Sequence, residues 1–293
     1  MTTRRSRLGL AATAPALLLL TACGPQSSVG SPPPAEVASL DADAVVLRID
    51  YTGGYVPVET IPSRLPVVSI YGDGRVITQG PVTLIYPGPA LPNLLQTVIS
   101  AEDVQTLVKK AQDAGVGTAA DVGQPPVADV QNTRFTLATP EGTKTLEVVA
   151  LGMEDVGGLT DAQKTARKKL SDLVNELNDV RATLGADRVT EPETYSPTAI
   201  AAIATPHVAQ PDPALPAQPA VAWPGPALPG DRLNASVDVG CVLAAGDEAS
   251  KVIGAAQKAN SDTPWESAGK RWKIAFRPLL PEETSCSDLA KQG

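Results

Sequence analysis

Histidine and aromatic residues are scarce in this chain, which limits the chemistry it can perform. The 293 residues include one histidine, two phenylalanines and three tryptophans. A triad-type hydrolase needs a histidine base and would have to use His207, which has no nucleophile elbow around it. We therefore expect no catalytic or metal role for His207. The shortage of aromatic platforms also argues against a sugar-binding cleft.

Glycine fingerprints and long apolar runs are absent as well. No phosphate-binding or dinucleotide-binding glycine pattern occurs at a strand-to-helix junction. One histidine and three cysteines argue against a zinc site. No apolar stretch reaches the roughly 20 residues that a membrane-spanning helix needs. The sequence thus predicts no cofactor, no metal and no transmembrane helix.

The N-terminal segment has the parts of a secretory signal peptide. Three arginines begin it, residues 8–20 are apolar apart from one threonine, and Leu20-Thr21-Ala22-Cys23 follows. This last motif resembles the lipobox of bacterial lipoproteins, whose cysteine receives a diacylglycerol before the preceding peptide bond is cut. The resemblance implies that residues 1–22 are a signal peptide and that Cys23 is lipidated. The alternative is an ordinary signal peptide, cleaved or uncleaved.

Anchoring through Cys23 would place the protein at the outer face of the cell membrane. Residues 23–40 are predicted to form the lipidated cysteine and a flexible Gly-, Ser- and Pro-rich tether. Removing the three arginines of residues 1–22 from the 24 basic residues leaves 21 against 32 acidic ones, a net charge of −11. That charge argues against nucleic acid. The expected partners are the membrane, through the lipid, and an envelope protein.

The two remaining cysteines are expected to form a disulfide. Cys241 and Cys286 are the only thiols left if Cys23 is lipidated, and thiols of exported proteins usually pair. The alternative, a redox-active pair, lacks the Cys-x-x-Cys spacing of such sites.

Residues 41–190 are predicted to form an α+β core. Asp73-Gly74 and Glu141-Gly142 are typical hairpin turns. Helices are expected from Ser100 to Gly115 and from Thr160 to Gly185, each with a capping residue at its start. In the second helix, Lys164, Arg167 and Lys168 are assigned to the solvated face. Strand-like runs occur at 44–50, 65–71, 75–78, 82–86, 134–138 and 144–151.

The rest of the chain divides at a proline-rich segment. Residues 191–234 contain ten of the 28 prolines and are predicted to be an extended linker or a belt across the core. Trp223 favours a belt that docks at least once. Residues 235–293 are predicted to be a strand-helix-strand unit stapled by Cys241 and Cys286. The fold class is therefore α+β, with antiparallel hairpins packed against two or three helices and a Pro-rich connecting segment.

Acidic residues are the remaining candidates for catalysis. Local pairs occur at Asp41 and Asp43, Glu154 and Asp155, and Glu191 and Glu193. A two-carboxylate envelope hydrolase is therefore an alternative function, although neighbouring acids on turns are usually only solvated. The leading hypothesis is a non-enzymatic binding or interaction module. A carrier of a small lipid or metabolite is a third hypothesis, and it requires an apolar cavity between sheet and helices.

Several motifs also resemble a group of uncharacterised actinobacterial secreted proteins and lipoproteins. The resemblance covers patches between about residues 44 and 287 and implies one shared architecture. It supplies no functional residues. Its motifs are Tyr51-Thr52-Gly53-Gly54-Tyr55-Val56-Pro57, Arg64-Leu65-Pro66, Gly72-Asp73-Gly74-Arg75-Val76, Tyr86-Pro87-Gly88-Pro89 and Arg277-Pro278-Leu279-Leu280-Pro281 with Cys286.

Overall fold

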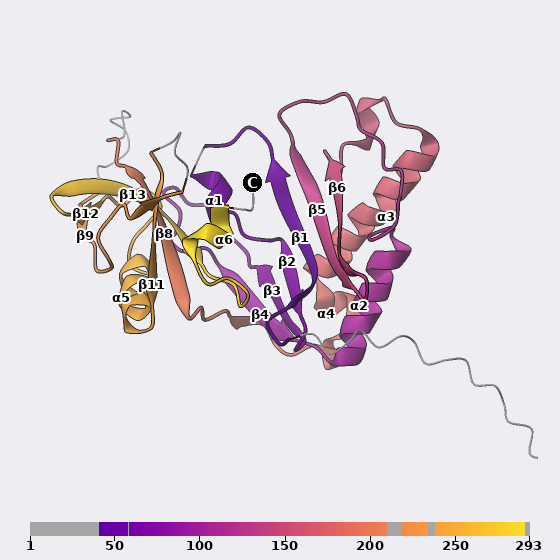
Figure 1. Cartoon of the computed structure of the whole chain (residues 1–293), viewed down its shortest axis with the longest axis horizontal. Helices are drawn as coiled ribbons and strands as arrows, with labels where there is room; N and C mark the ends of the chain where they lie inside the picture. The colour runs from indigo at the N-terminus through magenta and orange to yellow at the C-terminus, as the bar shows by residue number, and fades with distance from the viewer. Residues whose placement is uncertain (1–40, 58, 210–217, 234–237, 291–293) are drawn as a thin grey trace, which may run out of the picture. The chain divides into compact units, whose positions relative to one another are not determined.

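The structure is a computed structural model that describes residues 41–57, 59–209, 218–233 and 238–290. The predicted signal peptide, Cys23 and the predicted tether lie outside the described residues. All of the described residues belong to one compact unit, Val37–Gly293. Among them, no helix combines the length and the apolar character needed to cross a bilayer. The unit contains two β-sheets and several helices (Figure 1), which confirms the predicted α+β class.

The first sheet has seven strands in the order β6-β5-β1-β2-β3-β4-β7, and all neighbours are antiparallel. The predicted hairpins β2–β3 and β5–β6 are confirmed. Gly74 closes the first of them at φ +87°, where a Cβ would lie 2.2 Å from the Ile99 carbonyl oxygen, so only glycine fits. The strands are β1 (Val45–Gly53), β2 (Val68–Tyr71), β3 (Arg75–Gln79), β4 (Leu94–Val98), β5 (Gln131–Thr139), β6 (Gly142–Val149) and β7 (Glu193–Thr194).

Helices α2 (Ala101–Asp113), α3 (Asp161–Asn178) and α4 (Val180–Leu184) cover one face of this sheet (Figure 1). Both predicted caps are confirmed: Ser100 accepts from the Asp103 N–H, and Thr160 with Gln163 forms a capping box. The helices bury leucines and valines against the apolar face of the sheet, as their spacing predicts. This layer is the main hydrophobic core.

The prediction that Arg167 lies on the solvated face of α3 is wrong, because its side chain is fully buried. Its guanidinium donates to the carbonyl oxygens of Val149 (2.8 Å) and Ala150 (2.6 Å) and pairs with Glu154 (3.3 Å). Lys168 stays exposed and pairs with Asp172. The buried arginine satisfies the carbonyl of the last residue of β6 and that of the residue after it, a role that helical spacing alone does not reveal.

The second sheet has six strands in the order β10-β11-β8-β13-β12-β9. Its neighbours are antiparallel except β12 and β9, which are parallel. Helix α5 (Asp247–Ala256) packs on one of its faces. The strands are β8 (Ala199–Pro206), β9 (Val221–Ala222), β10 (Asp231–Arg232), β11 (Gly240–Ala245), β12 (Trp265–Ser267) and β13 (Lys270–Pro278).

Strand β8 lies inside the segment predicted to be a linker or belt, between β11 and β13. The C-terminal strand-helix-strand unit is thus completed by a strand from residues 191–234. The many prolines around β8 suggested an extended segment, although its residues 199–204 are all alanine or isoleucine. Residues 210–217 and 234–237 of these two segments lie outside the described residues.

Trp223 packs against the second sheet, as its isolated position in the sequence predicts. Its ring lies edge-on to that of Trp265 with 5.6 Å between ring centroids.

A disulfide joins Cys241 to Cys286, as the sequence predicts. It links β11 to the short helix α6 (Cys286–Ala290) on the face of the second sheet opposite α5. The remaining short elements are α1 (Thr60–Ser63) and the 3₁₀ turns Glu154–Val156 and Ala186–Arg188.

The predicted strand at 82–86 is wrong. Residues 81–86 form a solvent-exposed loop, and the strand that follows β3 is β4, at Leu94–Val98. The β-rich composition of residues 82–86 suggested a strand, but these residues have no partner strand in the described structure.

Candidate functional site

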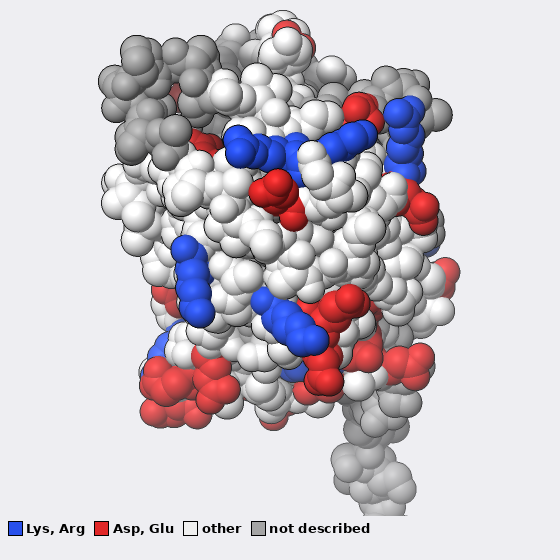
Figure 2. All heavy atoms as spheres, turned by 90° about the vertical axis from the view of Figure 1, so that its left-hand side faces the viewer, with Lys and Arg blue, Asp and Glu red and all other residues white. Residues whose placement is uncertain are grey.

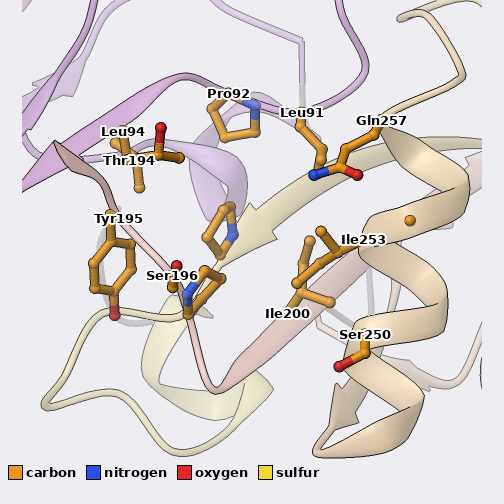
Figure 3. Close-up of a pocket in the computed structure, with 13 residues that line it drawn as sticks. Leu91, Pro92, Leu94, Thr194, Tyr195, Ser196, Ile200, Ser250, Ile253 and Gln257 are labelled. Carbon is orange, nitrogen blue, oxygen red and sulfur yellow. The ribbon is translucent and has the colours of Figure 1, made fainter.

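An apolar cleft of about 410 Å³ lies where the first sheet, the second sheet and α5 meet (Figure 3). The segment before β4 supplies one wall, the chain between β7 and β8 supplies a second, and α5 supplies the third. None of the lining residues is charged. They are Leu91, Pro92, Leu94, Thr194, Tyr195, Ser196, Pro197, Ile200, Ser250, Ile253, Gly254, Gln257 and Pro278.

Helix α5 presents one continuous face to the cleft. The lining residues Ser250, Ile253 and Gly254 of the helix and Gln257, its C-cap, follow the i, i+3, i+4, i+7 spacing of a single helical stripe. Gly254 is the smallest of them, and a Cβ built on it would meet no atom within 4 Å. Glycine inside a helix costs about 1 kcal/mol relative to alanine. The absence of a side chain at Gly254 leaves space in the cleft next to the middle of α5.

Tyr195 places a fixed phenol beside the cleft. Its hydroxyl donates to the carbonyl oxygen of Leu279 at 2.8 Å, which holds the ring in place. Burial is the main cause that raises the pKa of Tyr195 to about 12. The phenol is therefore neutral at physiological pH. Its ring forms part of the wall, and Thr194, Ser196 and Gln257 give the apolar cleft a few polar groups that can orient a ligand.

A polar cluster joins the two sheets through the turn that follows β13. From β1, Arg48 donates to Ser69 (2.9 Å) and to Tyr71 (3.3 Å), both on β2, and forms an ion pair with Glu282. The Tyr71 hydroxyl donates to Glu282 at 2.9 Å. Burial raises the pKa of the Tyr71 phenol and also the pKa of the nearby Asp50 carboxyl. The positive charge of Arg48 opposes both shifts. Glu282 thereby ties the turn to the first sheet.

The neighbouring residue ties the same turn to the second sheet. Glu283 pairs with Arg277 at 2.7 Å, and both side chains are almost fully buried. The second oxygen of Glu283 accepts from the Leu280 N–H at 2.7 Å. Arg277 also donates to the carbonyl oxygen of Arg64 at 2.8 Å. Because Arg48, Glu282, Arg277 and Glu283 are all engaged in ion pairs within the protein, we interpret the cluster as a clamp between the sheets.

The structure does not bring the residues singled out in the sequence together into a site. His207 lies at the end of β8 beside the Lys273–Glu59 ion pair, away from the apolar cleft. The three acidic pairs lie at separate places, and one member of each pairs with an arginine: Asp43 with Arg75, Glu154 with Arg167 and Glu191 with Arg181. No group of three metal-ligating side chains occurs in the described part of the chain.

The residues of the cleft were missed because single apolar and hydroxyl residues carry no local signal. The one usable hint was Gly254, a glycine inside an otherwise helical pattern. The polar cluster was missed too, because Arg48 and Glu282, which pair in it, are 234 positions apart in the sequence. Such pairings depend on the tertiary fold and leave no trace in local spacing.

Comparison of the chain with protein-family models, with curated proteins and with solved structures finds no match. The resemblance to actinobacterial lipoproteins therefore stays a prediction.

Proposed function

We propose that this protein is a lipoprotein at the outer face of the cell membrane that binds a small apolar or amphipathic molecule in the cleft against α5. The observation that carries the proposal is Gly254, which keeps the middle of the helical wall open. Cys23 would hold the protein at the membrane, and the cleft would hold the ligand.

The dimensions and chemistry of the cleft support binding. Its volume of about 410 Å³ falls within the roughly 300–1,000 Å³ of typical small-molecule sites. Leucines, isoleucines and prolines supply most of the wall, and hydroxyl and amide groups supply the polar contacts. The lining has no carboxylate or imidazole, and the Tyr195 hydroxyl already donates to the Leu279 carbonyl oxygen, so binding fits this site better than hydrolysis does.

Occupation of the cleft can be tested with Nile red, a neutral apolar dye. The parent chain should bind the dye saturably with an increase in fluorescence. Gly254→Leu places a side chain into the open space and should weaken dye binding about tenfold or more. Lys251→Leu adds the same side chain to an exposed position of the same helix and should bind like the parent.

Equal dye binding by the parent and by Gly254→Leu would remove the cleft as the site. Thermal unfolding of all three proteins shows whether the substitutions preserve the fold. Mass spectrometry of organic extracts from the parent and from Gly254→Leu, each purified from cell envelopes, would then identify a natural ligand by its enrichment with the parent alone.

The anchor is tested by the intact mass of the protein isolated from membranes. We expect the mass of the chain from Cys23 onward plus a diacylglyceryl group and its accompanying acylation. Cleavage elsewhere, or an unmodified Cys23, would contradict the proposed anchor without affecting the ligand-binding proposal.

A further inference from the structure

The loop between β3 and β4 exposes an unusual run of apolar side chains. Residues 81–86 are all exposed to solvent. Leu84 is fully exposed, and Val82, Ile85 and Tyr86 are 75%, 63% and 62% exposed. Single exposed apolar residues are common in soluble proteins, but a contiguous group marks a surface that contacts something else.

The loop is held at both ends, so its exposure follows from how its base is built. The Gly80 N–H donates to the carbonyl oxygen of Asn93 at 2.9 Å, and the Asn93 amide donates to that of Pro81 at 3.0 Å. On the other side, the Ser261 N–H donates to the carbonyl oxygen of Gly88 at 2.8 Å. These bonds fix the base of the loop, and residues 82–86 between them are exposed to solvent.

Charge distinguishes a lipid surface from a protein as the partner. No Asp, Glu, Lys or Arg occurs between Arg75 and Glu102, so the loop and both of its flanks are uncharged. Protein interfaces usually surround an apolar centre with polar and charged side chains. A segment that enters the boundary between headgroups and acyl chains must instead avoid charge, and a tyrosine at its edge suits that boundary.

The surface around the second sheet also carries few charged side chains. Figure 2 views the side that carries β9, β12 and α5, and uncharged atoms cover most of what it shows of the described residues. In the upper part of this view Lys and Arg side chains lie next to one another in a row, and in the lower part they stand apart. Insertion of apolar side chains does not depend on these charges, and it is the contact that the loop offers.

We propose that residues Val82–Tyr86 insert into the interfacial region of the lipid bilayer. This contact goes beyond the proposed lipid anchor, which only keeps the protein nearby. A chain of the 19 residues from Cys23 to Asp41 spans at most about 65 Å, which raises the local concentration of the loop at the membrane. Insertion would then set the orientation of the folded unit, and the loop leads directly into Leu91 and Pro92 at the wall of the cleft.

The test uses the chain from residue 23 onward with Cys23→Ser, so that lipidation plays no part. This chain retains the whole compact unit Val37–Gly293 and its disulfide. Leu84→Cys provides one free thiol for the environment-sensitive fluorophore NBD. Adding phosphatidylcholine vesicles should raise and blue-shift its emission. The same label at Glu141→Cys, in the β5–β6 turn, should not respond.

Vesicle flotation of unlabelled variants provides the second measurement. Leu84→Asp with Ile85→Asp should reduce the bound fraction about tenfold or more, since two carboxylates would have to enter the interface. Tyr55→Asp places a carboxylate on another exposed apolar residue and should float like the parent. An unresponsive label at position 84, or equal flotation of the double variant and the parent, would overturn the proposal and leave a protein partner as the occupant of the loop.

Discussion

At the scale of single residues, three inward-facing arginines carry much of the polar organisation of this fold. Arg167 and Arg277 are fully buried and Arg48 is partly buried, and each meets a carboxylate and at least one further oxygen. Guanidinium groups stay charged when buried, so each arginine requires these partners. Sequence reasoning assigned Arg167 to solvent because spacing reports the face of a helix, whereas the carbonyls that Arg167 reaches belong to distant residues.

Breaking the Arg277–Glu283 pair should destabilise the protein strongly. Glu283→Gln keeps the shape of the side chain but leaves the guanidinium without its counter-charge. Burial already lowers the pKa of Arg277, and Glu283 is the main group opposing that effect. We expect the free energy of unfolding in urea to fall by about 3 kcal/mol. Glu266→Gln, at an exposed position on β12, should change it by less than about 0.5 kcal/mol. An unchanged Glu283→Gln variant would show that the pair is not structural.

Tyr195 should make the fold sensitive to alkaline pH. Its pKa is raised to about 12, whereas a tyrosine in an unfolded chain titrates near 10. Between these values the unfolded chain releases the proton first, so the stabilisation present below pH 10 is lost as the pH rises toward 12. Tyr195→Phe removes this proton, and its stability should fall less steeply over that range in urea unfolding. Parallel pH profiles for the two proteins would contradict the assignment.

At the scale of elements, local signals predicted what depends on local contacts. The hairpins β2–β3 and β5–β6 and the capped helices α2 and α3 follow from turn residues and caps a few positions apart. The run at 82–86 has the composition of a strand but no neighbour to pair with, and β8 has an alanine-rich composition but lies between two strands. Pairing is a property of the whole sheet, so composition misplaced both.

The capping box of α3 should contribute measurably to stability. Thr160 accepts from the backbone N–H of Gln163 at 3.2 Å, and the Gln163 side chain accepts from the Thr160 N–H at 2.9 Å. Thr160→Ala removes the cap and should cost about 1 kcal/mol in urea unfolding. Thr165→Ala makes the same change inside the helix, where alanine is favoured, and should cost nothing. Equal losses in both variants would mean that the cap contributes nothing of its own.

At the scale of the whole molecule, residues 279–290 connect everything that the sequence analysis treated separately. Glu282 reaches the first sheet, Glu283 reaches β13, and Cys286 reaches β11. The apolar cleft contacts the same segment through Tyr195, whose hydroxyl donates to the carbonyl oxygen of Leu279 at 2.8 Å. None of these long-range contacts was predictable from spacing, except the disulfide, which followed from the number of cysteines.

Removing the disulfide should therefore weaken the unit as a whole. Cys241 and Cys286 are 45 positions apart, and closing a loop of that length in the unfolded chain stabilises the folded state by about 4 kcal/mol. Cys241→Ala with Cys286→Ala should lose about that amount in urea unfolding, and reduction of the parent should lose a similar amount. If the two treatments agree, the stabilisation belongs to the covalent link itself. A loss below about 1 kcal/mol in both would show that the contacts of Glu282 and Glu283 already hold the C-terminal segment without it.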